Sequence, residues 1–443
     1  MIYLSYDRGS IIIRGDIGTP YGQWDPRIKA YRGMALNYPE IKSFLDKSNV
    51  AYRDDVLDLP PTPILRSRMT LRSYQKEALK AWLEAGKRGV IVLPTGAGKT
   101  HIALQAIQIL NEPTLIVVPT IDLIDQWRKH LSEQFNIDVG VLGGGEEQVR
   151  PITVSTYDSA TIRADQLGNR FVFLVFDEVH HLPAPTYSQI AEMYIAPHRM
   201  GLTATYERED DAHKDLPRLM GGKVFELDVD RLVGKHLSPY DYEKVLVELT
   251  PQEEEEYQKE YAVFRDYIRS RGIKLESAAD FQRFIMRTGR DAEARKALLA
   301  RNKALRIVLN SEAKIETLGN YLKMYGNERS LIFTRYNELV YAISRRFLIP
   351  AVTHQTPKEE RREILDEFRA GTYKAIVTSQ VLDEGIDVPD TSIGFILGGT
   401  GSSREYIQRL GRILRKKEGK RARLIEFVAK ETMETRISQR RHR

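Results

Sequence analysis

The feature that most constrains the fold is a glycine-rich octapeptide, LPTGAGKT, at residues 93–100. A short apolar run at 89–93, GVIVL, leads into it, and a helix-forming stretch, HIALQAIQIL, follows it. Glycines in such a turn let backbone N–H groups face phosphate oxygens, and the start of the next helix adds partial positive charge. Position 93 is Leu where the usual pattern has Gly, but the strand–loop–helix context is intact. The octapeptide therefore predicts a phosphate-binding loop.

In a loop of this kind the lysine reaches the β- and γ-phosphates of a nucleoside triphosphate, and the final hydroxyl binds magnesium. We therefore expect ATP and Mg²⁺ as cofactors. The nucleotide-binding residues predicted from the loop are Thr95, Gly96, Gly98, Lys99 and Thr100.

A second signal is an acidic pair that follows the apolar run FVFLVF at 171–176. Asp177 at the end of a buried strand can hold magnesium through water, and Glu178 can orient and deprotonate an attacking water. Such a pair could equally cap a helix, but with a phosphate loop upstream it predicts a hydrolytic site. We expect His180 to hydrogen-bond within this site. A metal pair with His181 is not expected, because adjacent residues point in different directions.

A third signal is the segment QRLGRILR at residues 408–415. Arg412 and Arg415 lie three apart, so on a helix they share one face. Together with Gln408 they are candidate catalytic residues, because arginines that reach across a cleft to a γ-phosphate accelerate phosphoryl transfer by about 10³–10⁵. Hydrolysis would then depend on closing two domains around ATP. The alternative is a basic surface helix that contacts nucleic acid or nothing.

The rhythm of short buried runs alternating with helices predicts α/β architecture with parallel sheets, and it occurs twice along the chain. Before it, residues 2–6 and 11–14 predict a hairpin, and a proline-rich linker, LPPTP, ends this part at 59–63. The predicted domains are 1–65, 66–240, 241–315 and 316–443.

The segment 241–315 differs from its neighbours because it is charged, helical and without a strand rhythm. Thr250 can cap a helix, Pro251 suits the first helical position, and Glu253 can reach back to the cap. This segment is either a helical linker packed on the following domain or a protruding insertion that grips the substrate.

Composition narrows the classes of function. The chain has no cysteine, which excludes disulfides, zinc-thiolate sites and iron–sulfur clusters and fits a cytosolic protein. The sequence contains no run of about 18 apolar residues, so no membrane span is predicted. The N-terminus is not typical of a secretory signal. Lys and Arg outnumber Asp and Glu by 67 to 61, and the basic excess is concentrated at 404–443, which permits binding to a polyanion or forms a solvated tail.

Taken together, these motifs resemble those of superfamily 2 helicases, which implies two RecA-like phosphate-loop ATPase domains. Arg72 and Gln75, in LRSYQ at 71–75, resemble the motif that reads adenine. Further matches are PT at 119–120 with QW at 126–127, STY at 155–157, TAT at 203–205, FTR at 333–335 and LDEGID at 382–387.

A finer resemblance is to the XPB-type DNA repair helicases, in their archaeal form. The triplet at 208–210, RED, follows TAT as in that family, the helical segment is similar to its thumb, and the first 65 residues occupy the place of its damage-recognition domain. The resemblance implies duplex DNA as substrate, 3′-to-5′ polarity, a role in nucleotide excision repair, a location at the nucleoid, and a nuclease partner that contacts the thumb and second domain. The residues it implies in DNA binding or coupling are Pro119, Thr120, Thr156, Thr203, Thr205, Arg208, Glu209, Asp210, Thr334, Arg335, Gly385 and Asp387.

Two alternatives remain at this stage. An RNA helicase would share the motor core, although the sequence DEVH at 177–180 and the RED triplet argue against it. A module that uses nucleotide only as a switch would not need Glu178, Arg412 and Arg415.

Overall fold

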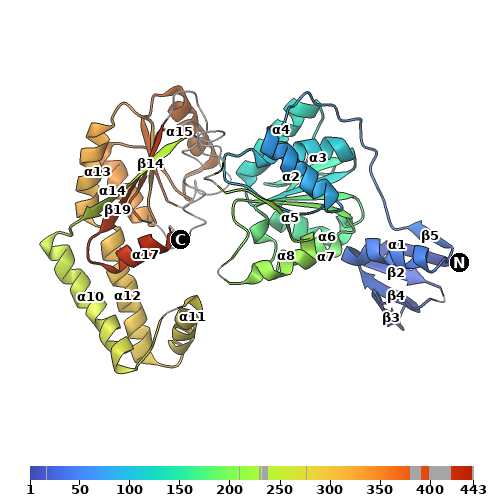
Figure 1. The fold of residues 1–443 in the computed structure, drawn as a ribbon, viewed down its shortest axis with the longest axis horizontal. Helices are drawn as coiled ribbons and strands as arrows, with labels where there is room; N and C mark the ends of the chain where they lie inside the picture. Colours follow the sequence, from blue (N-terminus) through green and yellow to red (C-terminus); the bar gives the residue numbers. More distant parts are fainter. Residues whose placement is uncertain are drawn as a thin grey trace. The chain divides into compact units, whose positions relative to one another are not determined.

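The computed structural model describes residues 1–15, 17–208, 210–228, 231, 238–275, 277–379, 391–398 and 421–441. The chain divides into two compact units, Met1–Arg231 and Leu232–Arg443, and each contains a parallel β-sheet covered by helices (Figure 1). Among the helices within these ranges, none is long and apolar enough to cross a membrane.

The N-terminal domain is a five-stranded sheet with one helix, α1 (Tyr38–Lys47), packed on it. Its first two strands form the expected antiparallel hairpin, with Arg8 and Gly9 of the turn at φ 45° and 84°. Such positive φ angles are those that tight hairpin turns require. In the order β3-β4-β2-β1-β5 the strands are β3 (Gly22–Asp25), β4 (Ala30–Met34), β2 (Ser10–Arg14), β1 (Ile2–Asp7) and β5 (Tyr52–Asp55).

This N-terminal domain is docked on the larger domain of the same unit. The Tyr6 hydroxyl lies 2.8 Å from the carbonyl oxygen of Ala164 and 3.2 Å from that of Met193. Ile195, from the larger domain, is fully buried in the core of the N-terminal domain. Burial raises the pKa of Tyr6 to about 12, so its hydroxyl stays protonated and remains a donor at neutral pH.

The larger domain of the first unit is built on an eight-stranded sheet, parallel except for the antiparallel pair β8–β9. The central strands β7 and β11 are buried at every residue, which explains why they read as unbroken apolar runs in the sequence. In sheet order the strands are β13 (Lys223–Glu226), β6 (Arg88–Val92), β12 (His198–Thr203), β11 (Phe173–Asp177), β7 (Thr114–Val118), β10 (Ile152–Thr156), β8 (Gly140–Gly143) and β9 (Glu146–Gln148).

Helices on the two faces of this sheet complete the three-layered domain (Figure 1). They are α2 (Ser73–Glu84), α3 (Lys99–Leu110), α4 (Ile121–Phe135), α5 (Tyr157–Ile162), α6 (Ala164–Leu167), α7 (Ser188–Met193) and α8 (Leu216–Met220), with short 3₁₀ turns η2 (Val179–His181) and η3 (Ala212–Asp215).

The second unit contains a six-stranded, all-parallel sheet. In sheet order its strands are β14 (Tyr240–Val247), β19 (Ala422–Ala429), β18 (Ile393–Ile396), β15 (Ser330–Phe333), β17 (Ala375–Thr378) and β16 (Ala351–Val352). The helices associated with it are α13 (Glu312–Met324), α14 (Asn337–Phe347), α15 (Lys358–Ala370) and α17 (Met433–Arg441).

Strand β14 corrects the expectation that residues 241–315 lack strands. All eight of its residues pair in parallel with β19. In the sheet order β14 is an edge strand, and several of its residues are exposed, so its sequence, YDYEKVLV, mixes charged and apolar positions. An edge strand buries less surface than a central one, so the apolar signal that marked the other strands is missing here.

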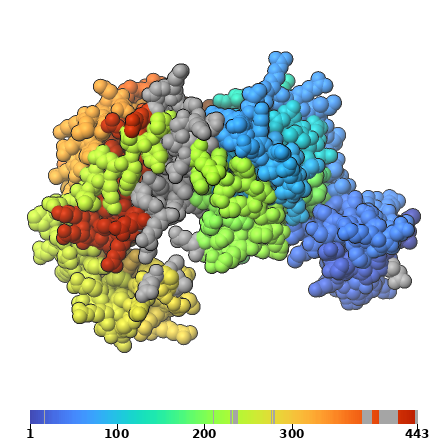
Figure 2. Space-filling model, in the orientation of Figure 1, coloured from blue at the N-terminus to red at the C-terminus, as the bar shows by residue number. Residues whose placement is uncertain are grey.

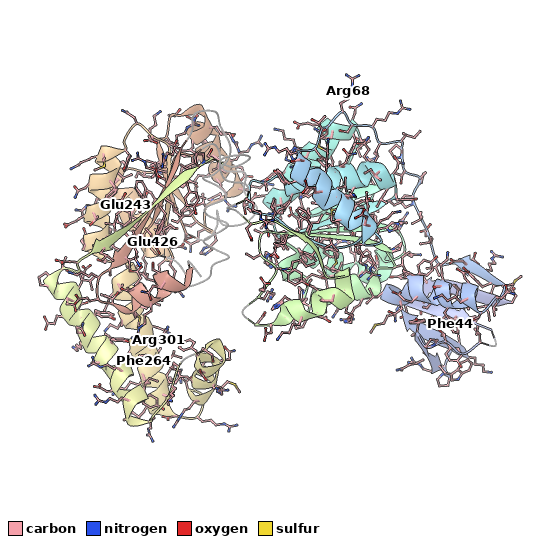
Figure 3. All side chains as sticks on the ribbon, in the orientation of Figure 1. Phe44, Arg68, Glu243, Phe264, Arg301 and Glu426 are labelled. Carbon is pink, nitrogen blue, oxygen red and sulfur yellow. The ribbon has the colours of Figure 1, made fainter. Side chains whose placement is uncertain are left out.

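The predicted helical insertion is present as α10 (Pro251–Ser270), α11 (Ala278–Arg287) and α12 (Ala292–Leu309). The expected cap of α10 is confirmed, because Thr250 Oγ1 accepts from the Glu253 N–H at 3.3 Å and Glu253 Oε2 accepts from the Thr250 N–H at 3.0 Å. Arg301 lies over the Phe264 ring, 5.9 Å from its centre (Figure 3). In Figure 2 these helices form a lobe distinct from the body of the second unit.

A buried ion pair joins the start of α13 to α17. Lys314 Nζ lies 2.8 and 2.6 Å from the two carboxylate oxygens of Glu434, and it also donates to the Leu397 carbonyl oxygen at 2.9 Å. Both side chains are fully buried. Neither charge can be left alone in such a place, since an unpaired buried ion is strongly destabilising.

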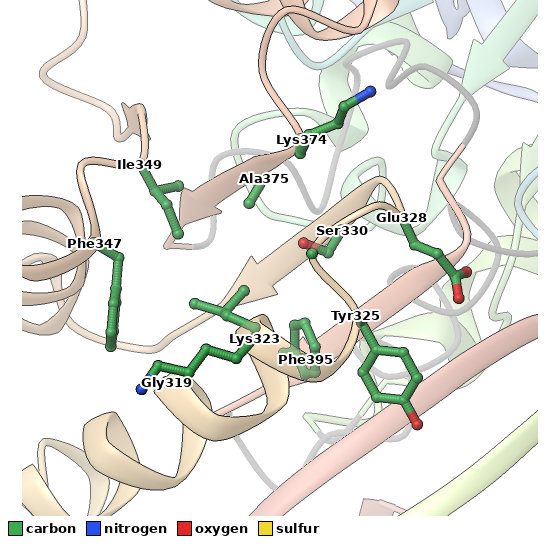
Figure 4. A pocket seen from close by; sticks show the side chains of 12 residues that line it. Gly319, Lys323, Tyr325, Glu328, Ser330, Phe347, Ile349, Lys374, Ala375 and Phe395 are labelled. Carbon is green, nitrogen blue, oxygen red and sulfur yellow. The ribbon is translucent and has the colours of Figure 1, made fainter.

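A small pocket of about 260 Å³ opens at the end of the six-stranded sheet where β15 and β17 begin (Figure 4). Its lining is mainly apolar and includes Phe347, Ile349 and Phe395. Because β15 begins at Ser330 and its carboxyl end precedes Thr334, the pocket is not on the edge that carries the predicted motif residues.

We expect Lys314→Met to destabilise the second unit by about 3–5 kcal/mol, because it leaves the Glu434 carboxylate buried without its counter-charge. Lys430→Met is the matched control, since Lys430 pairs with Glu248 at 3.0 Å with side chains 46% and 79% exposed, and exposed pairs contribute at most about 1 kcal/mol. Chemical denaturation followed by circular dichroism measures both losses. Equal losses in the two variants would contradict the importance of the buried pair.

Candidate active site

The phosphate loop has the predicted strand–loop–helix setting. Residues 93–98 connect β6 to α3, which begins at Lys99. Gly96 and Gly98 have φ angles of 83° and 76°, which non-glycine residues rarely adopt. Lys99 Nζ donates to the Leu93 carbonyl oxygen at 3.1 Å, so its ammonium group lies over the loop.

Side chains from the start of α2 hold this loop from the outside. Gln75 Nε2 donates to the carbonyl oxygens of Ala97 and Gly98 at 3.0 and 3.3 Å, and the Tyr74 hydroxyl donates to that of Ala97 at 2.7 Å. Gln75 Oε1 accepts from the Arg72 N–H at 2.9 Å. Gln75 therefore supports the loop in this structure, and the reading of adenine by Arg72 and Gln75 stays a prediction.

The acidic pair lies at the end of β11. Asp177 is buried, and its Oδ1 accepts from the Glu178 N–H at 3.1 Å while its Oδ2 accepts from Trp127 Nε1 at 2.9 Å. Burial raises the pKa of the Asp177 carboxyl, and the Trp127 hydrogen bond and the Lys99 charge oppose that rise. Lys99 and Asp177 therefore lie close enough for their charges to interact.

Glu178 has an unusual backbone, with φ 49° and ψ 55°. Non-glycine residues in this left-handed region are uncommon and cluster at functional sites. Its Oε2 is buried, lies 3.4 Å from His180 Nδ1, and makes no hydrogen bond to any residue in the described part of the chain. A buried carboxylate oxygen with unused acceptor capacity is suited to bind a water molecule.

A network links this pair to the motif at 203–210. His180 is fully buried, and its Nδ1 lies 3.0 Å from Thr203 Oγ1, so the prediction that it bonds within the site is confirmed. The Thr203 hydroxyl donates to the Thr205 carbonyl oxygen at 2.8 Å. Arg208 donates to the His180 carbonyl oxygen and forms a two-pronged pair with Asp210 at 2.9 and 2.7 Å. Thr203 is fully buried, so in this structure it can act through His180 and not by direct contact with nucleic acid.

Two of the predicted nucleic-acid contacts begin neighbouring helices. Thr120 Oγ1 accepts from the Leu123 N–H at 3.3 Å at the start of α4, and Thr156 Oγ1 accepts from the Ser159 N–H at 3.1 Å at the start of α5. The preceding strands, β7 and β10, pair in parallel with Thr156 opposite Val118. The two helix N-termini therefore lie side by side, and Pro119 joins β7 to the first of them.

In the second unit, the predicted residues after β15 are placed differently. Thr334 is fully buried, with Oγ1 3.2 Å from the Tyr336 carbonyl oxygen. In this structure its side chain therefore cannot contact nucleic acid directly. The Arg335 guanidinium lies 5.5 Å from the centre of the Tyr336 ring.

The remaining predicted site residues lie outside the described residues, and their roles stay predictions. They are Glu209, Gly385, Asp387, Gln408, Arg412 and Arg415.

Three aromatic residues in the site were not assigned a role from the sequence. Tyr74 contacts the phosphate loop, Tyr157 donates to the Asp177 carbonyl oxygen at 3.1 Å, and Trp127 donates to the Asp177 carboxylate. Each has one polar atom on an otherwise apolar ring and each lies within a recognised motif. That combination could have predicted a hydrogen bond within the site, because a buried Tyr or Trp usually finds a hydrogen-bond partner.

Comparison with known proteins identifies the family. The model described as "Type III restriction enzyme, res subunit" matches residues 68–208, the helicase conserved C-terminal domain matches 313–417, and the Xeroderma pigmentosum group B helicase damage recognition domain matches 4–56. The fold is similar to the crystal structure of the Pyrococcus furiosus Hef helicase domain, with a TM-score of 0.54 and 20% identity over 84% of this chain and 98% of that one.

Among curated proteins, the "DNA 3'-5' translocase XPB2" of Sulfurisphaera tokodaii is 46% identical over 441 residues, which is 100% of both chains. The "Putative DNA 3'-5' helicase Rad25" of Haloarcula marismortui is 32% identical over 85% of this chain, which spans 55% of that longer relative. With matches to both helicase models and to the damage recognition model, and with 46% identity to an archaeal relative over the full length of both chains, the chain belongs to the XPB family of helicases and translocases.

Proposed function

We propose that the protein is an ATP-driven motor that moves along DNA with 3′-to-5′ polarity and opens duplex DNA in nucleotide excision repair. The observation that carries this proposal is the arrangement of one sheet edge. Val92 of β6 is opposite Thr203 of β12, and Leu202 of β12 is opposite Asp177 of β11. The phosphate loop, the motif after Thr203 and the acidic pair therefore leave three adjacent parallel strands at the same edge.

The residues at this edge fit a magnesium-bound nucleoside triphosphate. Thr95 Oγ1 and Glu178 Oε2 are both buried without a hydrogen-bond partner among the described residues. A phosphate or a water molecule could supply the missing hydrogen bond to each of these atoms. We assign Lys99 to the phosphates, and Thr100 and Asp177 to the metal. The bound ion would neutralise charge on the phosphates, while Glu178 orients and deprotonates the attacking water.

Contact with DNA is assigned to the phosphate backbone. A motor must bind any sequence, and contacts to phosphates carry no sequence information. The adjacent N-termini of α4 and α5 suit this purpose, since helix N-termini attract anions. The Thr120 and Thr156 oxygens accept from backbone N–H groups, which leaves each hydroxyl hydrogen as a donor. Relatives named DNA translocase or helicase support DNA as the polymer.

The other parts of the motor are assigned by family resemblance. We propose that Arg412 and Arg415 of the second unit complete the ATP site and that Arg208 couples it to DNA opening. A nuclease partner on the thumb is supported by exposed apolar side chains there, with Met286 75% and Leu299 62% exposed. The proposed location is the nucleoid of an archaeal cell.

ATP hydrolysis should be stimulated strongly by DNA and weakly by RNA. Lys99→Ala should abolish multiple turnover, because it removes the charge that contacts the β- and γ-phosphates. Steady-state ATPase assays with tailed DNA, bubble DNA and RNA of matched sequence measure this. Arg362→Ala is a suitable control, since its side chain is 85% exposed in the second unit. Equal stimulation by RNA would reject the DNA assignment in favour of an RNA helicase.

Arg412→Ala should lower kcat by at least about 10³-fold with little change in the KM for ATP, because an arginine finger acts at the transition state. The measurement is ATPase activity under saturating DNA, again with Arg362→Ala for comparison. A loss of ATP affinity at unchanged kcat would show that Arg412 has a different role.

Gly98→Ala should lower nucleotide affinity by more than the strain of placing alanine in a left-handed backbone conformation explains. A Cβ at this position would come 2.6 Å from Gln75 Nε2 and so push the Gln75 amide off the loop. Gly86→Ala is the matched control, because Gly86 has a similar φ of 72° and a Cβ added there would have no atom of the described residues within 4 Å. Both variants should lose about 1–2 kcal/mol of stability, but only Gly98→Ala should lose ADP affinity in a calorimetric titration. Equal ADP affinities in the two variants would show that the contact of Gln75 with the loop does not contribute to nucleotide binding.

A further inference from the structure

Two helices that begin with predicted DNA contacts converge on one residue of the metal site. Helix α4 begins after Thr120, and Trp127 on that helix donates its indole N–H to Asp177 Oδ2 at 2.9 Å. Helix α5 begins after Thr156, and its first residue, Tyr157, donates its hydroxyl to the Asp177 carbonyl oxygen at 3.1 Å. One helix thus holds the carboxylate, and the other holds the backbone of the same residue.

The buried indole N–H of Trp127 has few possible partners other than Asp177. The ring is 1% exposed, and an indole N–H is only a donor, so it cannot accept instead or change its charge. The other carboxylate oxygen of Asp177 accepts from the Glu178 N–H at 3.1 Å. With one donor on each oxygen, the rotation of the carboxylate about its last bond, which is otherwise broad, is fixed.

Helix α4 is a rigid connection between the two ends of this path. Trp127 lies seven positions after Thr120, or roughly 10 Å along the helix axis. The helix packs against β7 and β10, both of which are buried at every residue. A shift of the helix start therefore moves Trp127 with it, because packed helices translate as units and do not deform continuously.

We propose that Trp127 is a positioning residue that orients the Asp177 carboxylate toward Mg²⁺, and that α4 and α5 transmit DNA contact at Thr120 and Thr156 to that carboxylate. This inference rests on the proposed function, since it assigns a route by which DNA would stimulate ATP hydrolysis. Trp127 itself touches neither nucleotide nor DNA in the proposal, and it acts only through Asp177.

The test compares two tryptophans in the same domain. Trp127→Phe keeps the ring and removes the N–H that reaches Asp177. Trp82→Phe is the matched control, because Trp82 is also fully buried and donates its Nε1 to a backbone carbonyl oxygen, that of Arg199, at 2.8 Å. Both variants lose one buried hydrogen bond, but only Trp127→Phe changes the metal site.

The first readout is binding without turnover. Affinity for ADP alone should be unchanged in Trp127→Phe, since the phosphate loop is intact. The gain in affinity that Mg²⁺ gives should fall about 10-fold, the factor that corresponds to one hydrogen bond to a charged group. Calorimetric titrations of ADP at several Mg²⁺ concentrations measure this. Equal Mg²⁺ dependence in the two tryptophan variants would overturn the positioning role.

The second readout concerns the connection to DNA. In Trp127→Phe, and to a smaller extent in Tyr157→Phe, the ratio of kcat with and without DNA should fall while the affinity for DNA stays unchanged. An unchanged ratio in both variants would overturn the coupling route. If the wild-type protein itself shows no stimulation by DNA, then the proposed function fails, and the ADP titrations still decide the role of Trp127.

A third measurement keeps Trp127 in place, in case its replacement prevents folding. The chain has three tryptophans, at positions 24, 82 and 127. In a Trp24→Phe/Trp82→Phe protein, Trp127 is the sole tryptophan, and its fluorescence should change when Mg²⁺ is added to the ADP complex. Fluorescence that does not respond to Mg²⁺ would contradict the proposal.

Discussion

The parallel hydrogen-bonding of the first sheet is the constraint on which the site depends. In a parallel sheet every strand ends at the same edge, and ligands bind outside those carboxyl ends. The phosphate loop, the acidic pair and the two helix starts after β7 and β10 occur at widely separated places in the sequence, but each follows such a strand end. The edge therefore gathers, from distant parts of the sequence, the groups that we propose hold phosphates, metal, water and nucleic acid.

Burial of polar groups then sets what these residues can do. Asp177 is buried, and a carboxylate in that position needs donors, which Trp127 and the Glu178 N–H supply. Directly after this buried strand the chain passes through the left-handed backbone of Glu178, and His180, two residues later, contacts Thr203. The network that continues to Arg208 joins the residues proposed for hydrolysis to the residue proposed to couple it to DNA opening.

In the second unit, the buried polar groups include an ion pair, Lys314–Glu434. The Lys314–Glu434 pair fixes α17 against α13 and holds the Leu397 carbonyl oxygen just after β18. Glu253, which caps α10, also accepts from the Ser311 hydroxyl at 3.1 Å and from the Glu312 N–H at 2.6 Å, so the base of the helical insertion α10–α12 is attached to the start of α13. These contacts tie the helical insertion to the second sheet and its helices, as does Tyr257, whose hydroxyl oxygen accepts from the Met433 N–H at 2.9 Å.

The sequence by itself determined the strands that are buried on both faces, the phosphate loop, the acidic pair and the cap of α10, because each depends on local residue types in a fixed order. It did not reveal the edge strand β14, whose charged residues are tolerated where one side of the strand is unpaired. It also could not show that Trp127 and Tyr157 hold Asp177, that Gln75 supports the phosphate loop, or that Lys314 meets Glu434. Those contacts join residues between 20 and 120 positions apart, and only the packing of complete helices on a complete sheet decides which buried polar atoms become partners.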